Sequence, residues 1–329
     1  MRTLLFTFIL ALFSALTSAQ TFSNIAIAEA STVCSIAQDE QGMVWLGTEG
    51  GLYSYDGYRT IPHNTAADGT VVATRIHSML VCHNIIYMGT ERGLLVYNIR
   101  SGRYGQPQWQ SPKDIRAVTL HQGRLWMGSA TGLYSCDLRT NNVLLENRQL
   151  HNVYSLLSTP RGLLVGTIDG LALRSPGGSV RRIPIGNGHQ PLVNALAPDR
   201  GTNDVWIGTE GALYRYDWRT LQPVAPLMGN SIKSLALHGD NIYAGTDNGM
   251  FIYNKVSNHI SHALHDSRSA RSIANNIVWA VYNDRWGNLW AGTDQGVSEI
   301  QRRPFYTYTP LSDITHTGDG NCLHLIFRS

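Results

Sequence analysis

The stretch Val44-Trp45-Leu46-Gly47-Thr48 decides the fold, because it recurs seven times along the chain. In every copy three apolar residues precede a glycine, and Thr or Ser follows it. The seven glycines are residues 47, 89, 128, 166, 208, 245 and 292 of the chain, which are 37 to 47 residues apart. Copies at a period of about 40 residues indicate a repeat protein in which each unit packs on the next.

The surrounding residues predict four short strands in each unit. An apolar, β-branched stretch such as residues 33–37 forms the first strand, and the glycine-containing stretch forms the second. The Thr-x-x-Gly sequence that follows predicts a hairpin of three residues, because the last glycine suits a left-handed conformation. Residues 51–56 and residues 59–63 then give the third and fourth strands of the first unit. We expect the core glycine to lie where a neighbouring sheet comes close.

Four antiparallel strands per unit of about 40 residues are typical of a propeller blade. The predicted fold is therefore all-β: a seven-bladed β-propeller over residues 20–309, with the first strands of a second propeller at the C-terminus. Residues 310–329 are expected to begin a truncated further blade, because residues 321–327 match the opening strand of another repeat. Residues 21–28 are expected to pair into blade seven and close the ring. In the alternative, residues 304–309 complete that blade.

The N-terminus has the pattern of a secretory signal peptide. Arg2 precedes an apolar run over residues 4–16, and the small residues Thr17, Ser18 and Ala19 follow. The run has about 13 residues, whereas a membrane-spanning helix needs about 20. We therefore expect residues 1–19 to be removed on export.

Composition excludes several classes of protein. Charged residues make up 15% of the chain and the net charge is +3, which gives no nucleic-acid footprint. The four cysteines form no CxxC pair, so no zinc site is predicted. No cofactor-binding or catalytic motif occurs in its required context, and we expect no metal, no cofactor and no catalytic residue.

Acidic residues occur in the predicted hairpins of six of the seven blades. On one face of the disc they would form a ring that could bind a cation or supply catalytic carboxylates. The alternative is that they are ordinary solvated turn residues. The six are Glu49, Glu91, Asp169, Glu210, Asp247 and Asp294.

Two tryptophans are the candidate ligand-binding residues, because aromatic rings stack on the apolar faces of sugars. Trp218 and Trp286 lie in turns that should face the side opposite the acidic hairpins, and Trp109 lies in a linker on the acidic side. The alternative for each is packing against its own linker. Three histidines spaced three residues apart and two basic pairs are other possible sites, more simply explained as surface residues. They are His259, His262 and His265, and the pairs at 181–182 and 302–303.

The repeats resemble the two-component regulator propeller repeat. The residues that carry the resemblance are Val33 to Asp56 and Asn276 to Thr293, with Asp39, Gly42 and Trp45 in the first and Asp284, Gly287 and Trp290 in the second. Exported arrays of this kind are similar to the N-terminal periplasmic sensor region of Bacteroides-type hybrid two-component system sensor histidine kinases. The resemblance implies a full-length protein with a second propeller, an inner-membrane helix and a kinase.

The resemblance also implies a function, that of a periplasmic sensor without enzyme activity of its own. We expect the chain to detect an oligosaccharide, to act as a homodimer in its full-length context and to control polysaccharide-utilisation genes. It would meet the membrane only through a C-terminal segment. Two alternatives stay open: a secreted propeller glycosidase or lyase, and a protein-interaction propeller of the cell envelope.

Overall fold

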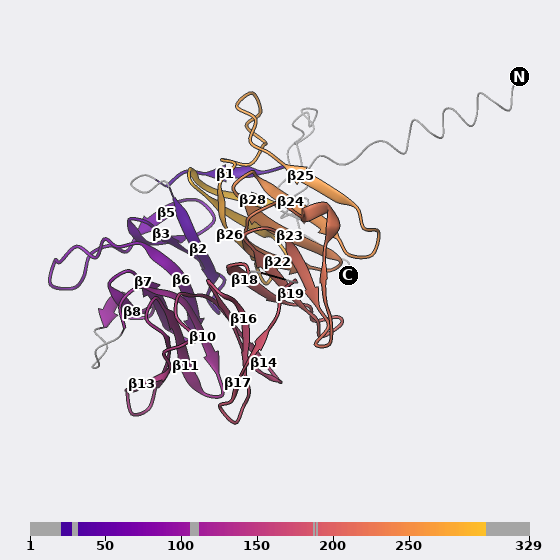
Figure 1. Ribbon diagram of the computed structural model, residues 1–329. Helices are drawn as coiled ribbons and strands as arrows, with labels where there is room; N and C mark the ends of the chain where they lie inside the picture. Colours follow the sequence, from indigo (N-terminus) through magenta and orange to yellow (C-terminus); the bar gives the residue numbers. More distant parts are fainter. Residues whose placement is uncertain (1–20, 28–31, 106–111, 187, 189, 301–329) are drawn as a thin grey trace, which may run out of the picture.

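The computed structural model describes residues 21–27, 32–105, 112–186, 188 and 190–300. In this part of the chain seven four-stranded antiparallel sheets stand around a common axis, each sheet being one blade (Figure 1). This confirms the predicted seven-bladed β-propeller. The signal-peptide region, residues 301–329 and Trp109 lie outside the described residues, so the predictions for them stay predictions.

The innermost strand of each blade lies next to the axis. These strands are β2 (Val33–Gln38), β6 (Ile76–Cys82), β10 (Ile115–His121), β14 (Val153–Thr159), β18 (Val193–Pro198), β22 (Ile232–His238) and β26 (Val278–Asn283). The second strands carry the repeated glycine and are almost entirely buried. They are β3 (Val44–Thr48), β7 (Ile85–Thr90), β11 (Arg124–Ser129), β15 (Gly162–Thr167), β19 (Val205–Thr209), β23 (Asn241–Thr246) and β27 (Leu289–Thr293).

The third and fourth strands complete each blade toward its outer edge. The third strands are β4 (Gly51–Tyr55), β8 (Gly93–Asn98), β12 (Leu133–Asp137), β16 (Gly170–Arg174), β20 (Leu213–Tyr216), β24 (Met250–Asn254) and β28 (Gly296–Ile300). The outer strands are β5 (Thr60–Pro62), β9 (Arg103–Gly105), β13 (Asn142–Asn147), β17 (Val180–Ile183), β21 (Leu221–Pro223), β25 (Ile260–Ala263) and β1 (Ser23–Ile25). One short 3-10 helix, η1 (Ala225–Leu227), follows β21.

The repeated glycine lets neighbouring blades approach. A side chain added at Gly128 would meet Val153 of the next blade at 2.4 Å, and one added at Gly292 would meet the Val33 carbonyl oxygen at 2.7 Å. Gly292 belongs to blade seven and Val33 to blade one, so the same contact that joins successive blades also closes the ring. This confirms the predicted role of the glycine.

The N-terminal strand completes blade seven. β1 pairs antiparallel with β28, with Asn24 opposite Ser298, and the two labels lie side by side in Figure 1. The Ser298 hydroxyl donates to Asn24 Oδ1 at 2.7 Å, and Phe22 is buried against blades six and seven. Ring closure by residues from the start of the chain is thus confirmed.

The hairpins between second and third strands have the predicted three residues in blades three, five and six, and are one residue shorter in the other four blades. Thr48 pairs with Gly51, which leaves two residues in the loop rather than three. The Thr48 hydroxyl donates to the Gly51 carbonyl at 2.9 Å and accepts from the Gly50 N–H at 3.1 Å. Gly51 has a φ of 125°, as the pattern required. The hydroxyl therefore stabilises a tighter loop than the glycine spacing alone suggested.

Candidate functional site

A β-bulge in every innermost strand turns one side chain toward the axis. In β2 the pairing with β3 shifts between Val33 and Ser35, so that Cys34 has no partner in the ladder. The same shift occurs in all seven innermost strands. A bulge leaves its extra residue unpaired and redirects the side chain. The residues placed in this way are Cys34, His77, Arg116, Tyr154, Asn194, Lys233 and Trp279.

These seven side chains line one cavity. It has a volume of about 690 Å³, and Arg75, Glu91 and Asp114 complete its lining. Each bulge lies at the strand end that pairs with the Thr or Ser of the glycine repeat, beside the hairpins between second and third strands. We call this side of the disc the hairpin face and the cavity the vestibule. A cavity lined from all seven blades lies on the ring axis.

The vestibule carries charge of both signs. Arg116 binds Asp114 at 2.7 Å, and the Lys233 ammonium binds Asp247 at 2.7 Å. Burial alone would lower the pKa of Arg116, but its hydrogen bonds to Asp114 raise the pKa above the ordinary value. Arg116 therefore remains cationic at neutral pH.

Aromatic side chains lie beside these cations. The Trp279 ring has the Arg75 guanidinium 5.2 Å and the Lys233 ammonium 4.4 Å from its centroid. The Trp279 indole N–H donates to Asp294 at 2.6 Å, which fixes the ring. The Arg116 guanidinium lies 4.4 Å from the centroid of the Tyr154 ring. The vestibule thus combines fixed aromatic surface with cations, which suits a polar ligand with an apolar face.

The acidic hairpin residues do not act as one ring. Asp247 holds Lys233, Asp294 holds Trp279 and Glu91 lines the vestibule. Asp169 and Glu210 are exposed turn residues. No group of three His, Cys, Asp or Glu residues that could hold a metal ion occurs among the described residues. Three of the six acidic residues therefore support or line the vestibule, a role that their spacing alone did not indicate.

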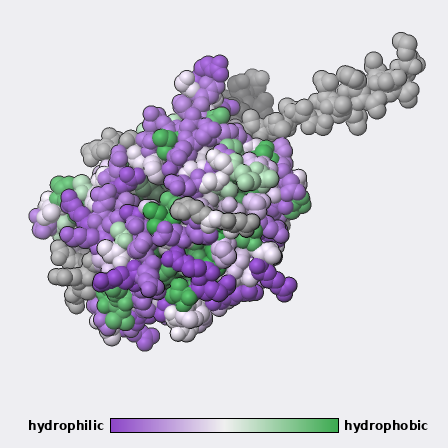
Figure 2. Space-filling model, viewed as in Figure 1, coloured by the Kyte–Doolittle hydropathy of each residue, from purple (hydrophilic) through white to green (hydrophobic). Residues whose placement is uncertain are grey.

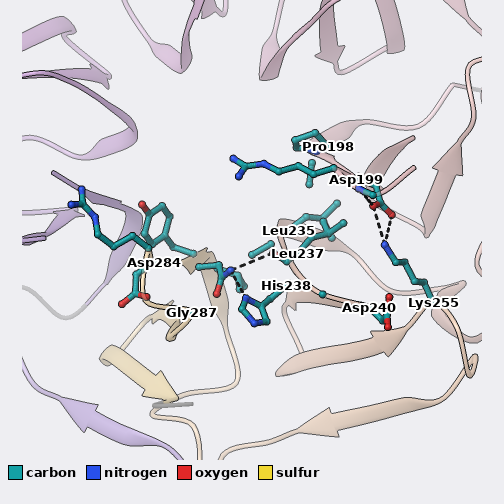
Figure 3. A pocket seen from close by; sticks show the side chains of 18 of the residues that line it. Pro198, Asp199, Leu235, Leu237, His238, Asp240, Lys255, Asp284 and Gly287 are labelled. Carbon is teal, nitrogen blue, oxygen red and sulfur yellow. Dashed lines mark hydrogen bonds and ion pairs between the residues drawn. The ribbon is translucent and has the colours of Figure 1, made fainter. Parts of the chain in front are cut away.

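The opposite end of the ring, which bears the turns between first and second strands, is the turn face. A larger cavity of about 970 Å³ opens there, lined mainly by blades five to seven, and we call it the turn-face chamber (Figure 3). It shares no lining residue with the vestibule. Figure 3 shows Lys255 reaching Asp199 at one side of this chamber, with Nζ–O distances of 2.7 and 2.9 Å.

The buried aspartates of the turn face hold the fold. Asp39, Asp199 and Asp284 each accept backbone N–H groups of their own turn and also the indole N–H of a second-strand tryptophan. Burial alone would raise the pKa of Asp199, but Lys255, Trp206 and the Gly201 N–H hold it below its ordinary value. These carboxylates are satisfied within the protein.

The structure places the two predicted ligand-binding tryptophans in packing contacts on the turn face. Trp218 lies 5.4 Å from Tyr216 between ring centroids, and its indole N–H donates to the Asn203 carbonyl at 2.8 Å. Trp286 is 49% exposed, and its ring lies over Gly42 of the neighbouring blade. The two belong to different blades, and neither lines either cavity. Their contact with a ligand stays a prediction.

The remaining candidate side chains have local roles. His262 stacks on Phe251 with ring centroids 3.9 Å apart, and His265 Nδ1 donates to the Ile273 carbonyl at 2.8 Å. Arg182 donates to the Thr167 hydroxyl and the Asp169 carbonyl, both at 3.2 Å. Cys34, Cys82 and Cys136 are free thiols. The pair at 302–303 and Cys322 lie outside the described residues.

The vestibule residues were missed by the sequence analysis, although a signal was present. Each bulge residue lies between Val or Ile and Ser or Ala, as in Val33-Cys34-Ser35 and Ile232-Lys233-Ser234. The flanking residues are alike in all seven copies, whereas the middle residue is of a different type in every one. Aligning the copies on their first strands, rather than on the glycine, would have exposed this contrast.

Comparison with known proteins assigns the repeats to a family. Residues 29–50 and 272–295 match the family model described as two component regulator propeller. The chain carries two-component regulator propeller repeats. Two of the segments that suggested the resemblance, in blades one and seven, are the ones matched. None of the curated proteins matches the chain.

Two of the solved structures that the chain resembles are extracellular domains. The chain is similar to the extracellular domain of the "putative hybrid two component system BT4673" of B. thetaiotaomicron, with 37% identity and a TM-score of 0.81 over 87% of this chain and 40% of that one. It also resembles the corresponding domain of BT3049 from the same organism, with 21% identity and a TM-score of 0.75 over 87% and 42%. The second likeness shows the fold alone.

The chain corresponds to only part of each of these two extracellular domains. It spans about 40% of the length of the structures that it matches. The relative at 37% identity is the extracellular domain of a "putative hybrid two component system". Among the described residues no helix is long and apolar enough to cross a membrane.

Proposed function

We propose that the chain is the extracytoplasmic ligand-sensing propeller of a hybrid two-component receptor that detects an oligosaccharide. The observation that carries the proposal is the 37% identity to an extracellular two-component domain over 87% of this chain. In this proposal the receptor passes the signal to a kinase and thereby controls polysaccharide-utilisation genes. The expected homodimer and membrane anchor belong to the full-length receptor.

The vestibule supports a ligand of oligosaccharide size. Its volume of about 690 Å³ lies in the ordinary range of small-molecule sites. Tyr154 and Trp279 offer aromatic surface, and the polar side chains around them offer hydrogen-bond donors and acceptors. Over the described residues, the side of the molecule seen in Figure 2 is largely hydrophilic, with small scattered apolar patches.

Signalling requires that the ligand prefers one arrangement of the receptor over another. A ligand with equal affinity for both arrangements shifts nothing, however tightly it binds. The blades are closely packed on one another, because each repeated glycine lies against the next blade. We therefore expect binding to change how the propeller meets its neighbours in the receptor, rather than the blades themselves.

A thermal-unfolding screen with defined oligosaccharides tests the proposal. A ligand that binds only the folded state stabilises it by RT ln(1 + [L]/Kd), about 2.7 kcal/mol at a hundred times Kd. We expect at least one oligosaccharide to raise the Tm of the purified chain by several degrees, without being consumed. The absence of a shift across neutral and acidic oligosaccharides would contradict the proposal.

The same samples separate the sensor from the two alternatives. Release of new reducing ends or of unsaturated sugars would identify a glycosidase or a lyase. Substitution of Glu91, the exposed acidic residue at the vestibule, would then abolish that release. Stable association with an envelope protein in the absence of any oligosaccharide effect would favour the interaction propeller.

A further inference from the structure

The vestibule contains a cation that the described part of the protein leaves uncompensated. Arg116 and Lys233 each bind a carboxylate, but Arg75 forms no ion pair within the described residues. Arg75 interacts with the Cys34 thiol, whose pKa is raised by burial in spite of the arginine. A neutral thiol offsets no charge. Arg75 therefore presents its positive charge to the cavity that it lines.

Two nitrogen atoms of the same cavity also lack hydrogen-bond partners among the described residues. Arg75 Nε and His77 Nε2 are buried, and neither has a hydrogen-bond partner among the described residues. The carboxylate nearest to His77 Nε2 is that of Asp114, at 3.8 Å, which is too long for a hydrogen bond. Only Ile76 separates the two residues in the chain. Buried polar atoms without partners are uncommon in folded proteins, and these two belong to residues that line one cavity.

The groups around Arg75 indicate which chemical class of ligand the cavity could bind. The Arg75 guanidinium and the Lys233 ammonium both lie over the Trp279 ring, although they come from blades two and six. One aromatic surface thus gathers two cations, one of them unpaired. An anion bound there would accept charge-assisted hydrogen bonds, which are shorter and stronger than neutral ones. A ligand with an apolar face next to its anionic group would also contact the ring.

We infer that the vestibule binds the anionic group of an acidic oligosaccharide, with Arg75 as its principal anchor. This inference rests on the proposed sensing function and specifies its ligand class. The anionic group can be the carboxylate of a uronic acid or a sulfate ester, which share their charge and their acceptor oxygens. The Trp279 ring and the cavity volume accommodate the sugar that carries it.

Calorimetric titration of the purified chain tests this inference. The probes are trimers of galacturonate and of glucuronate, a sulfated galactose trimer and the neutral galactose trimer. We expect an acidic trimer to bind and the neutral trimer to bind at least about 10-fold more weakly, because one charged hydrogen bond is lost. The relative affinities of uronate and sulfate distinguish the two anions.

Substitution of the anchor localises the binding. Arg75→Gln is expected to lower the affinity for the acidic trimer by about 10- to 100-fold, which is the range for the loss of one charge-assisted hydrogen bond. Arg200→Gln is the matched control, because Arg200 is exposed and lines the turn-face chamber. Circular dichroism and Tm show whether both variants are folded, and Arg75→Lys tests the charge alone if Arg75→Gln is unstable.

The outcomes separate this inference from the proposed function. If a neutral oligosaccharide binds and no acidic one does, the anionic ligand is wrong while the sensor proposal stands. If an acidic trimer binds equally well to the wild type and to Arg75→Gln, the anchor is wrong. If no oligosaccharide of either kind binds, both proposals fail.

Discussion

The two ends of the innermost strands are built from the same repeat but differ in how their charged groups are paired. At the turn face, Asp39, Asp199 and Asp284 accept hydrogen bonds from their own turns and from buried indoles. At the hairpin face, Arg75 forms no ion pair within the described residues, and its Nε has no hydrogen-bond partner there. One end holds the blades together, and the other offers groups to a ligand.

This difference teaches where a propeller has freedom to vary. The turn-face aspartates recur because each one performs the same structural task in its blade. The bulge residues of the hairpin face differ in every blade because the ladder makes no demand on an unpaired residue. Variation at a position of fixed geometry is what a recognition surface needs, since each blade can contribute a different group.

Ring closure has the largest expected effect, because both ends exist only while blade seven is complete. Removing residues 20–28 deletes β1 together with the buried Phe22, which is 5% exposed. Loss of a buried phenylalanine side chain alone costs about 3–5 kcal/mol. We expect the deletion to lower the free energy of unfolding by more than about 5 kcal/mol in urea titration. Unchanged stability would show that β1 does not close the ring.

The second-largest loss of stability is expected on substitution of Asp199. Its carboxylate is 3% exposed and binds Lys255, Trp206 and the Gly201 N–H. Asp199→Ala leaves a buried ammonium without a partner, which costs about 3–5 kcal/mol. Urea unfolding at neutral pH measures the loss. Because its pKa is lowered in the folded state, this stabilisation is complete above about pH 4 and disappears as the pH falls through the lowered value.

Asp247 is the matched residue of the hairpin face. It also binds a lysine at 2.7 Å, but its side chain is 57% exposed. Exposed ion pairs contribute about 1 kcal/mol or less, so Asp247→Ala is expected to be several-fold milder than Asp199→Ala. Equal losses for the two variants would remove the distinction between a structural end and a recognition end.

The smallest effect concerns the pH dependence of stability. Burial and then the charge of Arg75 lower the pKa of His77, while Asp114 and Glu91 oppose them and Arg116 assists. The neutral imidazole is therefore favoured on folding, and its stabilisation is lost as the pH falls below about 6.5. His77→Gln should make the decline in Tm between about pH 7 and pH 5 shallower. The pKa values of His63 and His121 are also lowered, so these two residues would still cause part of the decline in Tm. An unchanged decline would contradict the role of His77.

The fold could be predicted because its signals are local and repeated. The glycine, its preceding apolar residues and the following Thr fix one strand and one hairpin, and seven copies give the ring. The predicted hairpin of three residues is present in blades three, five and six, whereas in the other four blades the Thr pairs with the Gly and leaves two residues, a difference that the Thr-x-x-Gly pattern does not encode. Closure by β1 was predicted from an additional strand-like segment before the first repeat.

The site could be predicted only in part, because a bulge is a property of paired strands. Nothing in Val33-Cys34-Ser35 taken alone states that Cys34 leaves the ladder. Arg75 belongs to blade two and Trp279 to blade seven, so their contact depends on ring closure. Exposed tryptophans such as Trp286 could be identified from turn positions, but its packing over Gly42 of another blade could not.

The central claim is that ligand binds at the hairpin face, and one paired titration tests it most directly. The oligosaccharide that raises the Tm of the wild-type chain is titrated calorimetrically into Trp279→Leu and Trp286→Leu, both confirmed as folded by circular dichroism. Trp279 lies in the vestibule, and Trp286 is exposed at the turn face. The account predicts loss of binding in Trp279→Leu and wild-type affinity in Trp286→Leu. The reverse result would place recognition at the turn face and contradict the account.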